Sequence, residues 1–404
     1  MAGPTITRVR TIATSPGEGN IQRRLIVVKV ETSEPGLCGL GCATFTQRHS
    51  AVRTVVDEFL APLLVGRDPC RIEDIWQTVH VNAYWRSGPV MNNALSGVDM
   101  ALWDILGKLA GLPVYQLLGG KCREGAAVYR HADGATLEQV EERVRQFMAQ
   151  GYQYIRAQWG GYGGRQALPA APDGAMPGAY YDPAGYARSV VTLFDHLREA
   201  LGFGVNLLHD VHERLAPIEA VRLAKLLEPH RLFFLEDLLP PEQVDWFRLV
   251  RQQCTTPMAM GELFVNTQEW RPLVEERLID FIRCHISAIG GLTAARKIQV
   301  MCELMGVRTA WHGPGDVSPI GHACNVHLDV MAPNFGVQEW AGFLDVEREM
   351  FPGCPELRDG YVYPNDKPGW GMDMDEALAA KYPCPEGVLE WTQARLPDGS
   401  PAYP

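Results

Sequence analysis

Apolar positions in the first 120 residues predict a short sheet followed by helices. Residues 26–32 (IVVKVET) are strand-like, a glycine-rich turn follows at 34–41, and we expect 41–46 to return as the partner strand. From residue 50 to 119 the apolar spacing becomes helical. One helix face is defined by apolar residues three or four positions apart, at Val98, Ala101, Leu102, Ile105, Leu106 and Leu109. The Gly-Leu-Pro sequence at 111–113 predicts the end of that helix.

After residue 120 the pattern changes to short apolar strands that alternate with helices. Helical stretches such as 217–227 and 292–304 separate successive strands. We predict eight strands, at 126–131, 154–158, 206–212, 232–236, 258–262, 281–286, 308–312 and 337–340. This βα alternation is typical of a parallel α/β barrel or of a doubly wound sheet.

The choice between these two α/β folds rests on a motif and on the chain length. No GxGxxG sequence opens any of the βα units, so the dinucleotide-binding sheet loses its main support and the barrel is favoured. A barrel of eight βα units takes about 250 residues, whereas this chain has 404. We therefore expect a second structural unit beside the barrel.

Two segments rich in glycine and proline stand outside this alternation. Residues 159–182 contain three prolines and show no apolar period. A long connection without regular structure is usually functional in a compact domain, and this one follows the carboxyl end of a strand, where barrel active sites lie. We expect the last segment, 346–404, to wrap back onto another part of the chain.

Charge and composition exclude several classes of protein. The formal net charge is −11 and no run of five like charges occurs, so a nucleic-acid partner is not expected. No apolar run reaches the ~18 residues of a membrane span, and no basic and then apolar leader opens the sequence. Ten scattered cysteines without a CxxC pair indicate reduced, mostly buried thiols. We expect a cytoplasmic protein without membrane contact.

Three acidic residues fall at corresponding positions of three successive predicted strands. Asp210, Glu236 and Glu262 stand 26 residues apart, one βα unit each. A single strand-end acid is usually a helix cap or a surface charge, but three in register would converge at the barrel mouth. Carboxylates that converge in a dry cleft need a cation to stay ionised, and hard oxygen ligands favour Mg2+. The spacing therefore predicts a magnesium site.

Histidines at the same strand ends are further candidates. His212 lies two residues after Asp210, and on a strand that spacing would put both side chains on one face. His312 ends the seventh strand in a similar position. His131 and His285, at the first and sixth strands, are weaker candidates.

The basic residues on the second and sixth strands are arginines. Arg156 and Arg283 would point positive charge at an anionic substrate, although each could equally form a surface ion pair. The chain has only seven lysines, and neither of these two strands carries one. The predicted barrel mouth is therefore rich in carboxylates, imidazoles and guanidinium groups but poor in amines.

Together with other motifs, these residues show that the sequence resembles the enolase superfamily and, within it, the mannonate dehydratase subgroup with its starvation-sensing-protein-like members. The motifs are 96–105 (SGVDMALWDI), 117–120 (LLGG), the three acids, 312–316 (HGPGD) and 337–340 (VQEW). The resemblance runs nearly end to end. It implies a (β/α)7β TIM-like barrel with an α+β capping domain built from both ends of the chain. The implied segments are an N-terminal cap, the barrel and a C-terminal completion of the cap, at 1–125, 126–345 and 346–404.

The same resemblance implies an acid-sugar dehydratase that uses Mg2+. In the family, the metal holds the substrate carboxylate and stabilises the enediolate that forms when the α-proton leaves. Tyr162, backed by Arg156, matches the base, because a neighbouring guanidinium favours a phenolate. His212 matches the acid that protonates the departing β-hydroxyl. Substrate contacts are implied for five more residues: His131, Arg283, His312, Asp316 and Glu339.

Some positions depart from the family pattern. Where members place an asparagine in the N-terminal capping region, this chain has Gln47, which we take as a further substrate contact. Pro314 stands where alanine is usual. The chain ends Pro401-Ala-Tyr-Pro, without the tryptophan-rich terminus that some members fold over the site. We expect these differences to affect substrate specificity, and none of them changes the three acids.

Three functions are compatible with these residues. The first is dehydration of D-mannonate and/or D-gluconate to 2-keto-3-deoxy-gluconate, by α-proton abstraction and β-elimination of water. The second is epimerisation at the same site, which usually needs two flanking bases and is disfavoured by the missing lysines. The third keeps the metal site but acts on another acid sugar or only senses a metabolite. The expected ligand is a small acid sugar, and the resemblance implies a homo-oligomer.

Overall fold

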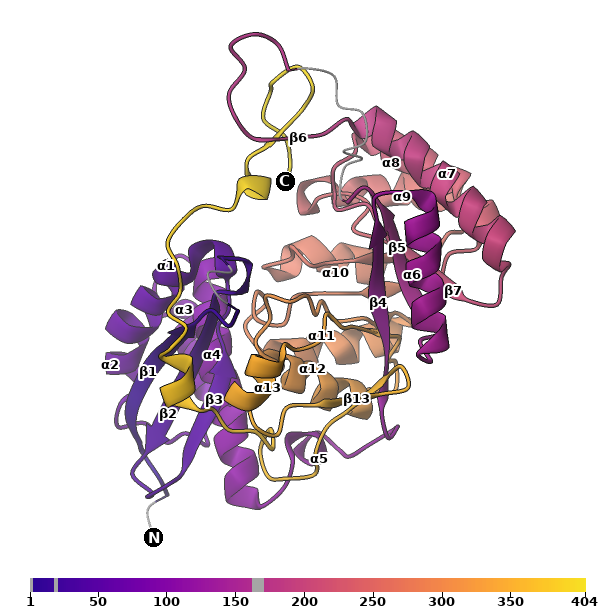
Figure 1. The fold of residues 1–404 in the computed structure, drawn as a ribbon. Helices are drawn as coiled ribbons and strands as arrows, with labels where there is room; N and C mark the ends of the chain where they lie inside the picture. Colours follow the sequence, from indigo (N-terminus) through magenta and orange to yellow (C-terminus); the bar gives the residue numbers. More distant parts are fainter. Residues whose placement is uncertain (1–2, 18–20, 162–170) are drawn as a thin grey trace.

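The computed structural model describes residues 3–17, 21–161 and 171–404. Figure 1 shows an N-terminal unit, coloured indigo to violet, beside a larger unit of alternating strands and helices. The C-terminal segment, in yellow, runs along the N-terminal unit and then crosses above the larger one. One apolar cluster lies wholly within residues 6–105, so the N-terminal unit has a core of its own.

The N-terminal sheet is an antiparallel meander of three strands, β1 (Ile6–Thr14), β2 (Leu25–Thr32) and β3 (Cys38–Cys42). The predicted strand corresponds to β2 and is confirmed. Its partner β3 begins at Cys38, earlier than the predicted residue 41. The reason is a tight turn, in which the Leu37 N–H donates to Glu34 O across Gly36, whose φ of 80° is left-handed.

The longest helix of this unit packs directly on the sheet. The helices and helical turns are η1 (Ile21–Arg23), η2 (Thr46–Arg48), α1 (His49–Thr54), η3 (Val55–Leu60), α2 (Ala61–Leu64), α3 (Ile72–Asn82), α4 (Pro89–Ala110) and α5 (Val114–Leu117). Helix α4 carries the predicted apolar face and ends at left-handed Gly111 (φ 67°). A Cβ at Gly41 of β3 would lie 1.9 Å from the Gly97 carbonyl oxygen of α4. This close approach requires glycine.

Eight parallel strands form the barrel: β4 (Ala126–Gly134), β5 (Tyr154–Trp159), β7 (Asn206–Asp210), β8 (Phe234–Glu236), β9 (Met258–Met260), β10 (Phe281–Ile282), β11 (Arg308–Thr309) and β12 (Gln338–Glu339). Seven pair side by side from β4 to β11, and β12 pairs with β4. A bridge between Thr309 and Phe335 links the two ends. All eight predicted strands are present in the described residues, but most end earlier than predicted.

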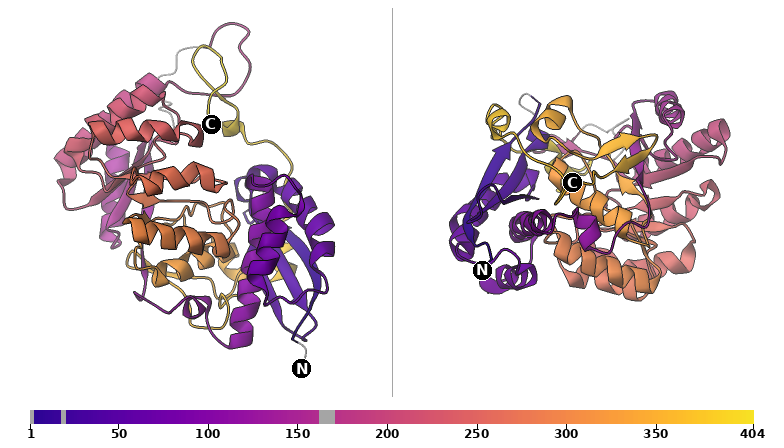
Figure 2. Two further views of the ribbon diagram at one scale, coloured as in Figure 1. Left: turned by 180° about the vertical axis from the view of Figure 1, so that it is seen from behind. Right: turned by 90° about the horizontal axis from the view of Figure 1, so that it is seen from below.

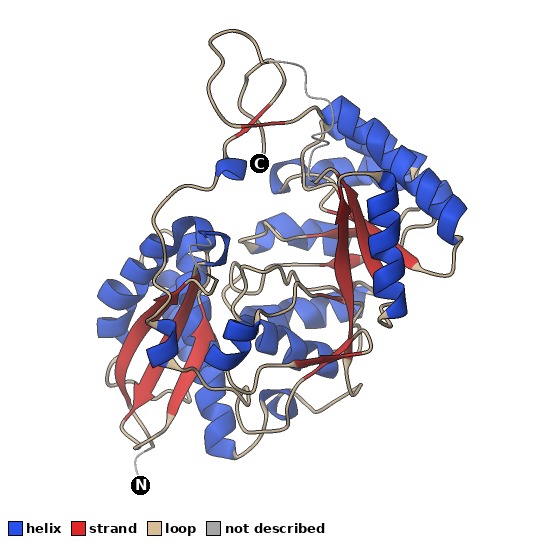
Figure 3. Ribbon diagram, viewed as in Figure 1, coloured by secondary structure: helices blue, strands red, loops and turns tan. Residues whose placement is uncertain are grey.

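A helix follows each of the first seven barrel strands in the described residues: α6 (Leu137–Ala149), α7 (Pro183–Leu201), α8 (Pro217–Leu226), α9 (Phe247–Gln253), α10 (Thr267–Glu275), α11 (Leu292–Met305) and α12 (Pro319–Met331). Short helical turns η5 (Glu228–His230) and η6 (Pro241–Trp246) lie between them. Figure 3 shows these helices in blue outside the red strands. The order confirms the predicted (β/α)7β barrel.

An apolar layer fills the inside of the barrel. It is formed by one side chain from seven of the strands or from a residue next to them, namely Tyr129, Leu208, Phe234, Ala259, Phe281, Ala310 and Val337. Bulky interior side chains make such a barrel a packed core rather than a pore. Polar groups at the carboxyl ends of the strands therefore lie above an apolar floor.

The C-terminal segment first returns to the N-terminal unit. It contains α13 (Asp345–Met350), β13 (Glu356–Arg358), β14 (Tyr361–Tyr363) and α14 (Glu376–Ala379), and β14 pairs antiparallel with β4. Glu376 forms ion pairs of 2.7 Å with both Arg10 and Lys29. The Ser15 N–H donates to the Tyr382 carbonyl at 2.8 Å. The predicted wrapping of the last segment onto another part of the chain is confirmed.

The last residues, 387–404, form what we call the C-terminal strap. They contain η7 (Glu390–Thr392) and β15 (Ala394–Arg395), and β15 pairs in parallel with β6 (Ala179–Tyr180). Figure 1 shows the strap and β6 in a small lobe above the two units, and the left panel of Figure 2 shows it from behind. The prediction that 159–182 lacks regular structure is wrong at β6, because its partner comes from the far end of the chain.

Two properties of the whole chain bear on its environment. Among the described helices, none combines the length and the apolar character needed to cross a membrane. All ten cysteines lie in the described ranges and are free thiols. Five of them are buried, fewer than predicted: Cys42, Cys254, Cys284, Cys302 and Cys324.

Candidate active site

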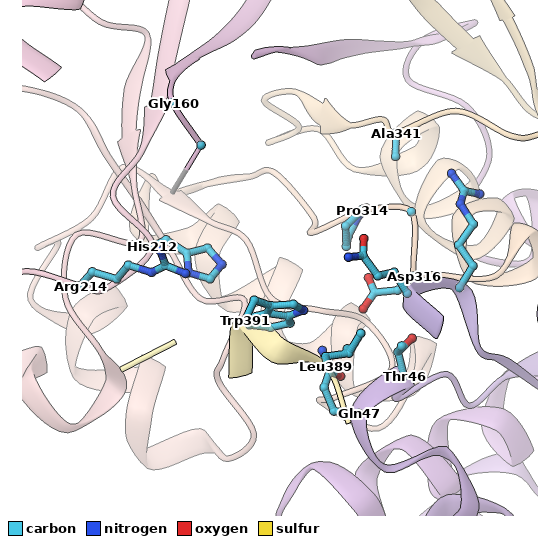
Figure 4. Close-up of a pocket in the computed structure, with 14 residues that line it drawn as sticks. Thr46, Gln47, Gly160, His212, Arg214, Pro314, Asp316, Ala341, Leu389 and Trp391 are labelled. Carbon is cyan, nitrogen blue, oxygen red and sulfur yellow. The ribbon is translucent and has the colours of Figure 1, made fainter. Parts of the chain in front are cut away.

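A cavity of about 610 Å3 opens at the carboxyl ends of the barrel strands. Its walls come from separate parts of the chain: Thr46 and Gln47 of the N-terminal unit, the end of β5 at 160–161, the turn at His212, the loop 314–316, and the strap. Figure 4 shows Asp316 and Gln47 facing the same space as Trp391 of the strap. This volume is typical of a small-molecule site.

Three acids meet at adjacent strand ends beside this cavity. Strand β7 ends at Asp210 and β8 ends at Glu236, and the two residues are direct partners in register. Glu262 follows the end of β9 by two residues. Asp210 and Glu236 are 1% and 0% exposed. The structure thus brings together the three carboxylates that the spacing singles out.

Two buried guanidinium groups lie against these carboxylates. Arg156 Nη1 is 3.0 Å from Asp210 Oδ2 and 3.1 Å from Glu236 Oε1. Arg283 Nη1 is 2.7 Å from Glu262 Oε2. Neither arginine belongs to the described residues that line the cavity. In this structure their charge is directed at the acids rather than at a surface partner, and their contact with a substrate stays a prediction.

For two acids of the cluster, the nearby positive charge does not outweigh the effect of burial on the pKa. Burial, followed by the charge of Glu236, raises the pKa of Asp210 well above its ordinary value, against the pull of Arg156. Burial also raises the pKa of Asp237 to about 8, although Arg283 opposes it. Buried carboxylates that crowd one another behave in this way when a counter-charge is missing.

Glu262 shows the opposite behaviour at the other edge of the cluster. Burial acts to raise its pKa, but His312, His212 and Arg283 outweigh that effect and hold the pKa at about 2. Glu339 resembles it: burial is again outweighed, here by His312 and Arg283, and its pKa is well below the ordinary range. The cluster therefore contains acids whose pKa values are shifted in opposite directions.

The donor chemistry of the cluster suits a divalent cation. Asp210, Glu236 and Glu262 offer carboxylate oxygens from neighbouring strands, the ligands that Mg2+ prefers. A cation among them would supply the charge that ionised Asp210 lacks. Within the described ranges, no trio of acidic, histidine or cysteine side chains is already spaced as a metal cage. The Nη1 atom of Arg156 lies between Asp210 and Glu236 instead.

His212 lies beyond the end of β7, not on the strand as predicted. Its φ of 54° is left-handed, and its N–H donates to Asp210 Oδ1 at 2.8 Å. This bend brings Nε2 to 3.6 Å from Glu262 Oε1. Burial lowers the pKa of His212 to about 4, although the charge of Glu262 opposes it. The imidazole thus reaches the acids through a turn rather than through strand alternation.

Three further histidines gather near Glu339 of β12. The carboxylate of Glu339 lies 2.9 Å from His131 Nε2 and 3.7 Å from His312 Nε2. His312 Nε2 is also 3.2 Å from Glu262 Oε2. His285 Nδ1 lies 2.8 Å from His312 Nδ1, and burial lowers the pKa of His285 to about 3. His285 is therefore a partner that orients His312.

The backbone around the acids is strained. Three non-glycine residues have left-handed φ angles: 54° at His212, 61° at Glu213 and 44° at Asp237. Each such residue costs about 1–3 kcal/mol and persists where the surroundings hold it, often at functional sites. Here the Glu213 N–H donates to the Asp237 carbonyl at 2.8 Å, which ties the two strained turns together.

Comparisons with known proteins agree with this arrangement. The family described as mandelate racemase / muconate lactonizing enzyme, N-terminal domain, matches residues 6–119. The family described as enolase C-terminal domain-like matches residues 139–378. The chain belongs to the enolase superfamily. The membership predicted from the sequence motifs is therefore confirmed.

Similar proteins within the superfamily are named as members of the D-galactonate dehydratase family. A D-galactonate dehydratase family member of Salmonella enteritidis PT4 is 58% identical, over 99% of this chain and 98% of the relative. One from Pantoea ananatis is 58% identical over 99% of both chains. A crystal structure described as an enolase from Pantoea ananatis with bound D-gluconate and Mg has a TM-score of 0.97, at 58% identity over 100% of both chains. This chain therefore belongs to the D-galactonate dehydratase family.

Sequence reasoning missed two residues of this superfamily site. The Tyr129 hydroxyl donates to Glu236 Oε2 at 3.0 Å and accepts from Arg283 Nη2 at 3.1 Å. Its position two residues before His131, on the same face of β4, is the signal that could have found it. Asp237 accepts from Arg283 and from the Gly261 N–H. Its signal is the pair of adjacent acids at the end of β8.

An aromatic residue of the C-terminal segment reaches the site, although the final residues, Pro401-Ala-Tyr-Pro, carry no tryptophan. Trp391 of the strap lines the cavity, together with Leu389. Trp391 stands well before the end of the chain, so the final residues alone do not reveal it. The pairing of β15 with β6 helps to hold this part of the strap over the mouth.

Ten of the twelve candidate site residues meet in one connected region, and Gln47 joins them across the cavity. The acids, His131, Arg156, His212, Arg283, His312 and Glu339 form the ionic network, and Asp316 lines the cavity wall. Tyr162, the expected base, lies outside the described residues. The chemical roles of all of them stay predictions.

Proposed function

We propose that this member of the enolase superfamily is a Mg2+-dependent dehydratase of acid sugars, which converts D-gluconate and/or D-mannonate to 2-keto-3-deoxy-gluconate. The observation that carries the proposal is the convergence of Asp210, Glu236 and Glu262 with His212 beside one cavity. The structure of a 58% identical protein, described with bound D-gluconate and Mg, supports the ligand and the metal. The name of the curated relatives adds D-galactonate as a substrate to test.

The metal would be held by the three strand-end carboxylates. Bound there, Mg2+ supplies positive charge for the carboxylate of the sugar acid and for the negative charge that develops when the α-proton leaves. The raised pKa of Asp210 supports this assignment, because a cation beside its carboxylate would favour the ionised form. Arg156 then neutralises the remaining charge from the side of β5.

The reaction removes one proton and one hydroxyl from neighbouring carbons. A base takes the proton from C2; we assign this role to Tyr162 on the resemblance alone. The C3–O bond breaks, and the departing hydroxyl takes a proton from Nε2 of His212 and leaves as water; the imidazole must first take up a proton from solvent, so that both ring nitrogens carry hydrogen before this step. The enol that remains becomes the 2-keto product when C3 takes a proton from solvent. Atoms balance, since substrate minus water equals product.

Residues around the cavity would recognise the sugar. Gln47 reaches in from the cap and Asp316 from the loop after β11, so each can bond a hydroxyl group. His131, His312 and Arg283 lie around Glu339 and Glu262, where they would orient the acid end of the substrate. Because the walls come from the N-terminal unit, several barrel loops and the strap, small shifts in them would change which sugar stereochemistry fits.

We also propose that the protein acts as a homo-oligomer in the cytoplasm. Tyr84 and Trp85 are 79% and 81% exposed on the loop between α3 and α4. Aromatic residues of this kind are enriched in protein interfaces, and free thiols fit a reducing compartment. Light scattering on a size-exclusion column is expected to give a multiple of 44.8 kDa. A monomer at micromolar concentration would contradict the assembly.

A screen of sugar acids tests the function directly. Purified protein with Mg2+ is incubated with five- and six-carbon sugar acids, including D-gluconate, D-mannonate and D-galactonate, and the 2-keto-3-deoxy product is measured. We expect product from at least one of the first two. If no sugar acid reacts while one binds with Mg2+ present, the protein is a metabolite sensor with an intact site. Interconversion of two sugar acids without loss of water would show an epimerase.

A further inference from the structure

The C-terminal strap touches the imidazole of His212 at two points. The main-chain oxygen of Pro404 lies 3.2 Å from Nδ1. The indole of Trp391 meets the imidazole edge to face, with ring centroids 6.3 Å apart and an interplanar angle of 75°. Figure 4 shows Trp391, on the short helix η7, lying between His212 and the cap residue Gln47.

The contact with Pro404 fixes which way the imidazole faces. A main-chain carbonyl oxygen can only accept a hydrogen bond, so Nδ1 carries the hydrogen and donates it to Pro404. The ring then directs Nε2 toward the acids, 3.6 Å from Glu262 Oε1. Without that acceptor, rotation about the side-chain torsions would allow the ring to turn Nε2 away.

We propose that the C-terminal strap positions His212 for proton transfer, with the main-chain oxygen of Pro404 as the hydrogen-bond acceptor and Trp391 as the packing surface. Pro404 is a positioning residue and touches no substrate. The proposal rests on the function proposed above, in which Nε2 of His212 protonates the departing hydroxyl. The imidazole that donates the proton is then held in position by a segment almost 200 residues away in the sequence.

The strap is fastened to the barrel at points distant from Pro404. The Tyr181 N–H donates to the Arg395 carbonyl at 3.0 Å, beside the β15–β6 pair. Tyr181 is 3% exposed, and its hydroxyl donates to the Arg214 carbonyl at 3.3 Å. Arg214 lies two residues after His212. The strap and the turn that carries His212 are therefore attached to the same short segment.

A reversal of the strap brings its last residues back to the mouth. The Leu396 N–H donates to the Ser400 carbonyl at 2.9 Å, and the Ala402 N–H donates to the Ala394 carbonyl at 3.0 Å. These bonds close a turn after β15 that sends residues 403–404 toward His212. Damage to β15–β6 pairing is therefore expected to release Pro404 as well.

Deletion of Tyr403 and Pro404 tests the positioning role. In the full chain with Mg2+, we expect kcat for dehydration of the best sugar acid to fall about 10- to 100-fold, because an acid group must be held in line with the leaving hydroxyl. KM and exchange of the α-proton with solvent should stay within about twofold, since neither needs His212 to donate. Equal losses in exchange and dehydration, or unchanged dehydration, would overturn the proposal.

A second variant loosens the strap without altering any residue that touches His212. A Cβ at Gly178 would lie 2.4 Å from the Gln393 carbonyl oxygen, so Gly178→Ala forces the β15–β6 pair apart. Gly204→Ala is the matched control, because its Cβ meets nothing within 4 Å. We expect Gly178→Ala to lose dehydration and keep α-proton exchange, as the deletion does. Full dehydration activity in Gly178→Ala with a displaced strap would contradict the proposal.

A measurement without substrate separates this proposal from the proposed function. In 15N-histidine NMR spectra of the Mg2+-loaded protein, His212, identified by its loss in His212→Asn, should show a protonated Nδ1. The deletion should shift that signal toward a mixture of tautomers, whereas Gly204→Ala should not. An unchanged His212 signal in the deletion would overturn the strap proposal even if the enzyme dehydrates sugar acids. If the deletion changes the signal but the protein dehydrates no sugar acid, only the proposed function is refuted.

Discussion

At the scale of single residues, the surroundings shift the pKa values of similar carboxyl groups in opposite directions. Burial and the charge of Glu236 raise the pKa of Asp210, whereas the histidines and the arginine around Glu262 hold its pKa at about 2. The same carboxyl chemistry thus gives two different states within one cluster. That contrast favours a cation near Asp210 rather than a uniform ion-pair network.

Replacement of His212 by asparagine should separate the two halves of the reaction. We expect His212→Asn to lower the rate of dehydration at least about 100-fold, because the acid for the leaving hydroxyl is lost. Mg2+ binding should persist, since none of the three proposed metal ligands changes. Product formation and calorimetric Mg2+ titration measure the two effects. Retained turnover would remove His212 from the acid role.

The three acids could be predicted from the sequence because they are spaced by one βα unit. This spacing does not depend on the conformation of the loops. Their partners were harder to find. Tyr129 and Asp237 act through contacts between strands, and the left-handed turn at His212 cannot be read from a run of residue types. Trp391 reaches the cavity only through a pairing between segments more than 200 residues apart.

At the scale of elements, close packing and long-range pairing fix the frame of the site. Helix α4 lies on β3 so tightly that side chains are excluded at Gly41. The βα alternation made the barrel predictable, since each strand and its helix are local patterns. The carboxyl end of each strand was harder to predict from the sequence. The residues there bend into the mouth of the barrel, where their side chains contribute to the site and no longer to the sheet.

A methyl group at Gly41 tests the packing of α4 on the N-terminal sheet. Gly41→Ala places Cβ about 1.9 Å from the Gly97 carbonyl oxygen, so the helix has to move. We expect a loss of about 1–3 kcal/mol in the free energy of unfolding by urea. Gly204→Ala, in open space, should change it by less than about 0.5 kcal/mol. Equal stability of the two variants would contradict the packing described.

The attachment of α14 to the cap should depend on pH. Hydrogen bonds from Arg10, with help from Lys29, hold the pKa of Glu376 at about 2, below its ordinary value. A lowered carboxyl pKa stabilises the fold above the unfolded-state pKa, and this contribution is lost as the pH falls from about 5 to about 2. Because the Glu376 side chain is 35% exposed, screening limits the effect to about 1 kcal/mol.

The variant Glu376→Gln isolates that contribution. Wild type should be more stable than the variant at pH 7, and the difference in unfolding free energy should vanish as the pH approaches 2. Urea titrations at several pH values measure it. A difference that grows toward low pH would contradict the ion pairs with Arg10 and Lys29.

At the scale of the whole molecule, the site belongs to no single unit. The barrel supplies the acids, the N-terminal unit supplies Gln47, and the strap closes the cavity from above. The resemblance allowed the cap to be predicted, but it did not indicate that Trp391 and Leu389 of the strap line the cavity. Substrate specificity is therefore the property that could be predicted least from the sequence, because it depends on how the barrel, the N-terminal unit and the strap pack together.

Binding of Mg2+ should stabilise the whole protein. A ligand that binds only the folded state at 100 times its Kd adds about 2.7 kcal/mol to stability, so the melting temperature should rise with Mg2+ and fall with a chelator. Glu236→Gln should lose most of this rise, whereas Glu219→Gln, at an exposed ion pair on α8, should keep it. An equal rise in both variants would place the metal elsewhere.

The most direct test of the whole account is one NMR experiment in D2O with purified protein, Mg2+ and D-gluconate. The account predicts 2-keto-3-deoxy-gluconate with one deuterium at C3, formed only with Mg2+ and absent with Glu236→Gln. That single result would report loss of the C2 proton, departure of the C3 hydroxyl and uptake of a solvent proton. Unchanged D-gluconate, tested in parallel with D-mannonate and also left unchanged, would contradict the proposed dehydratase.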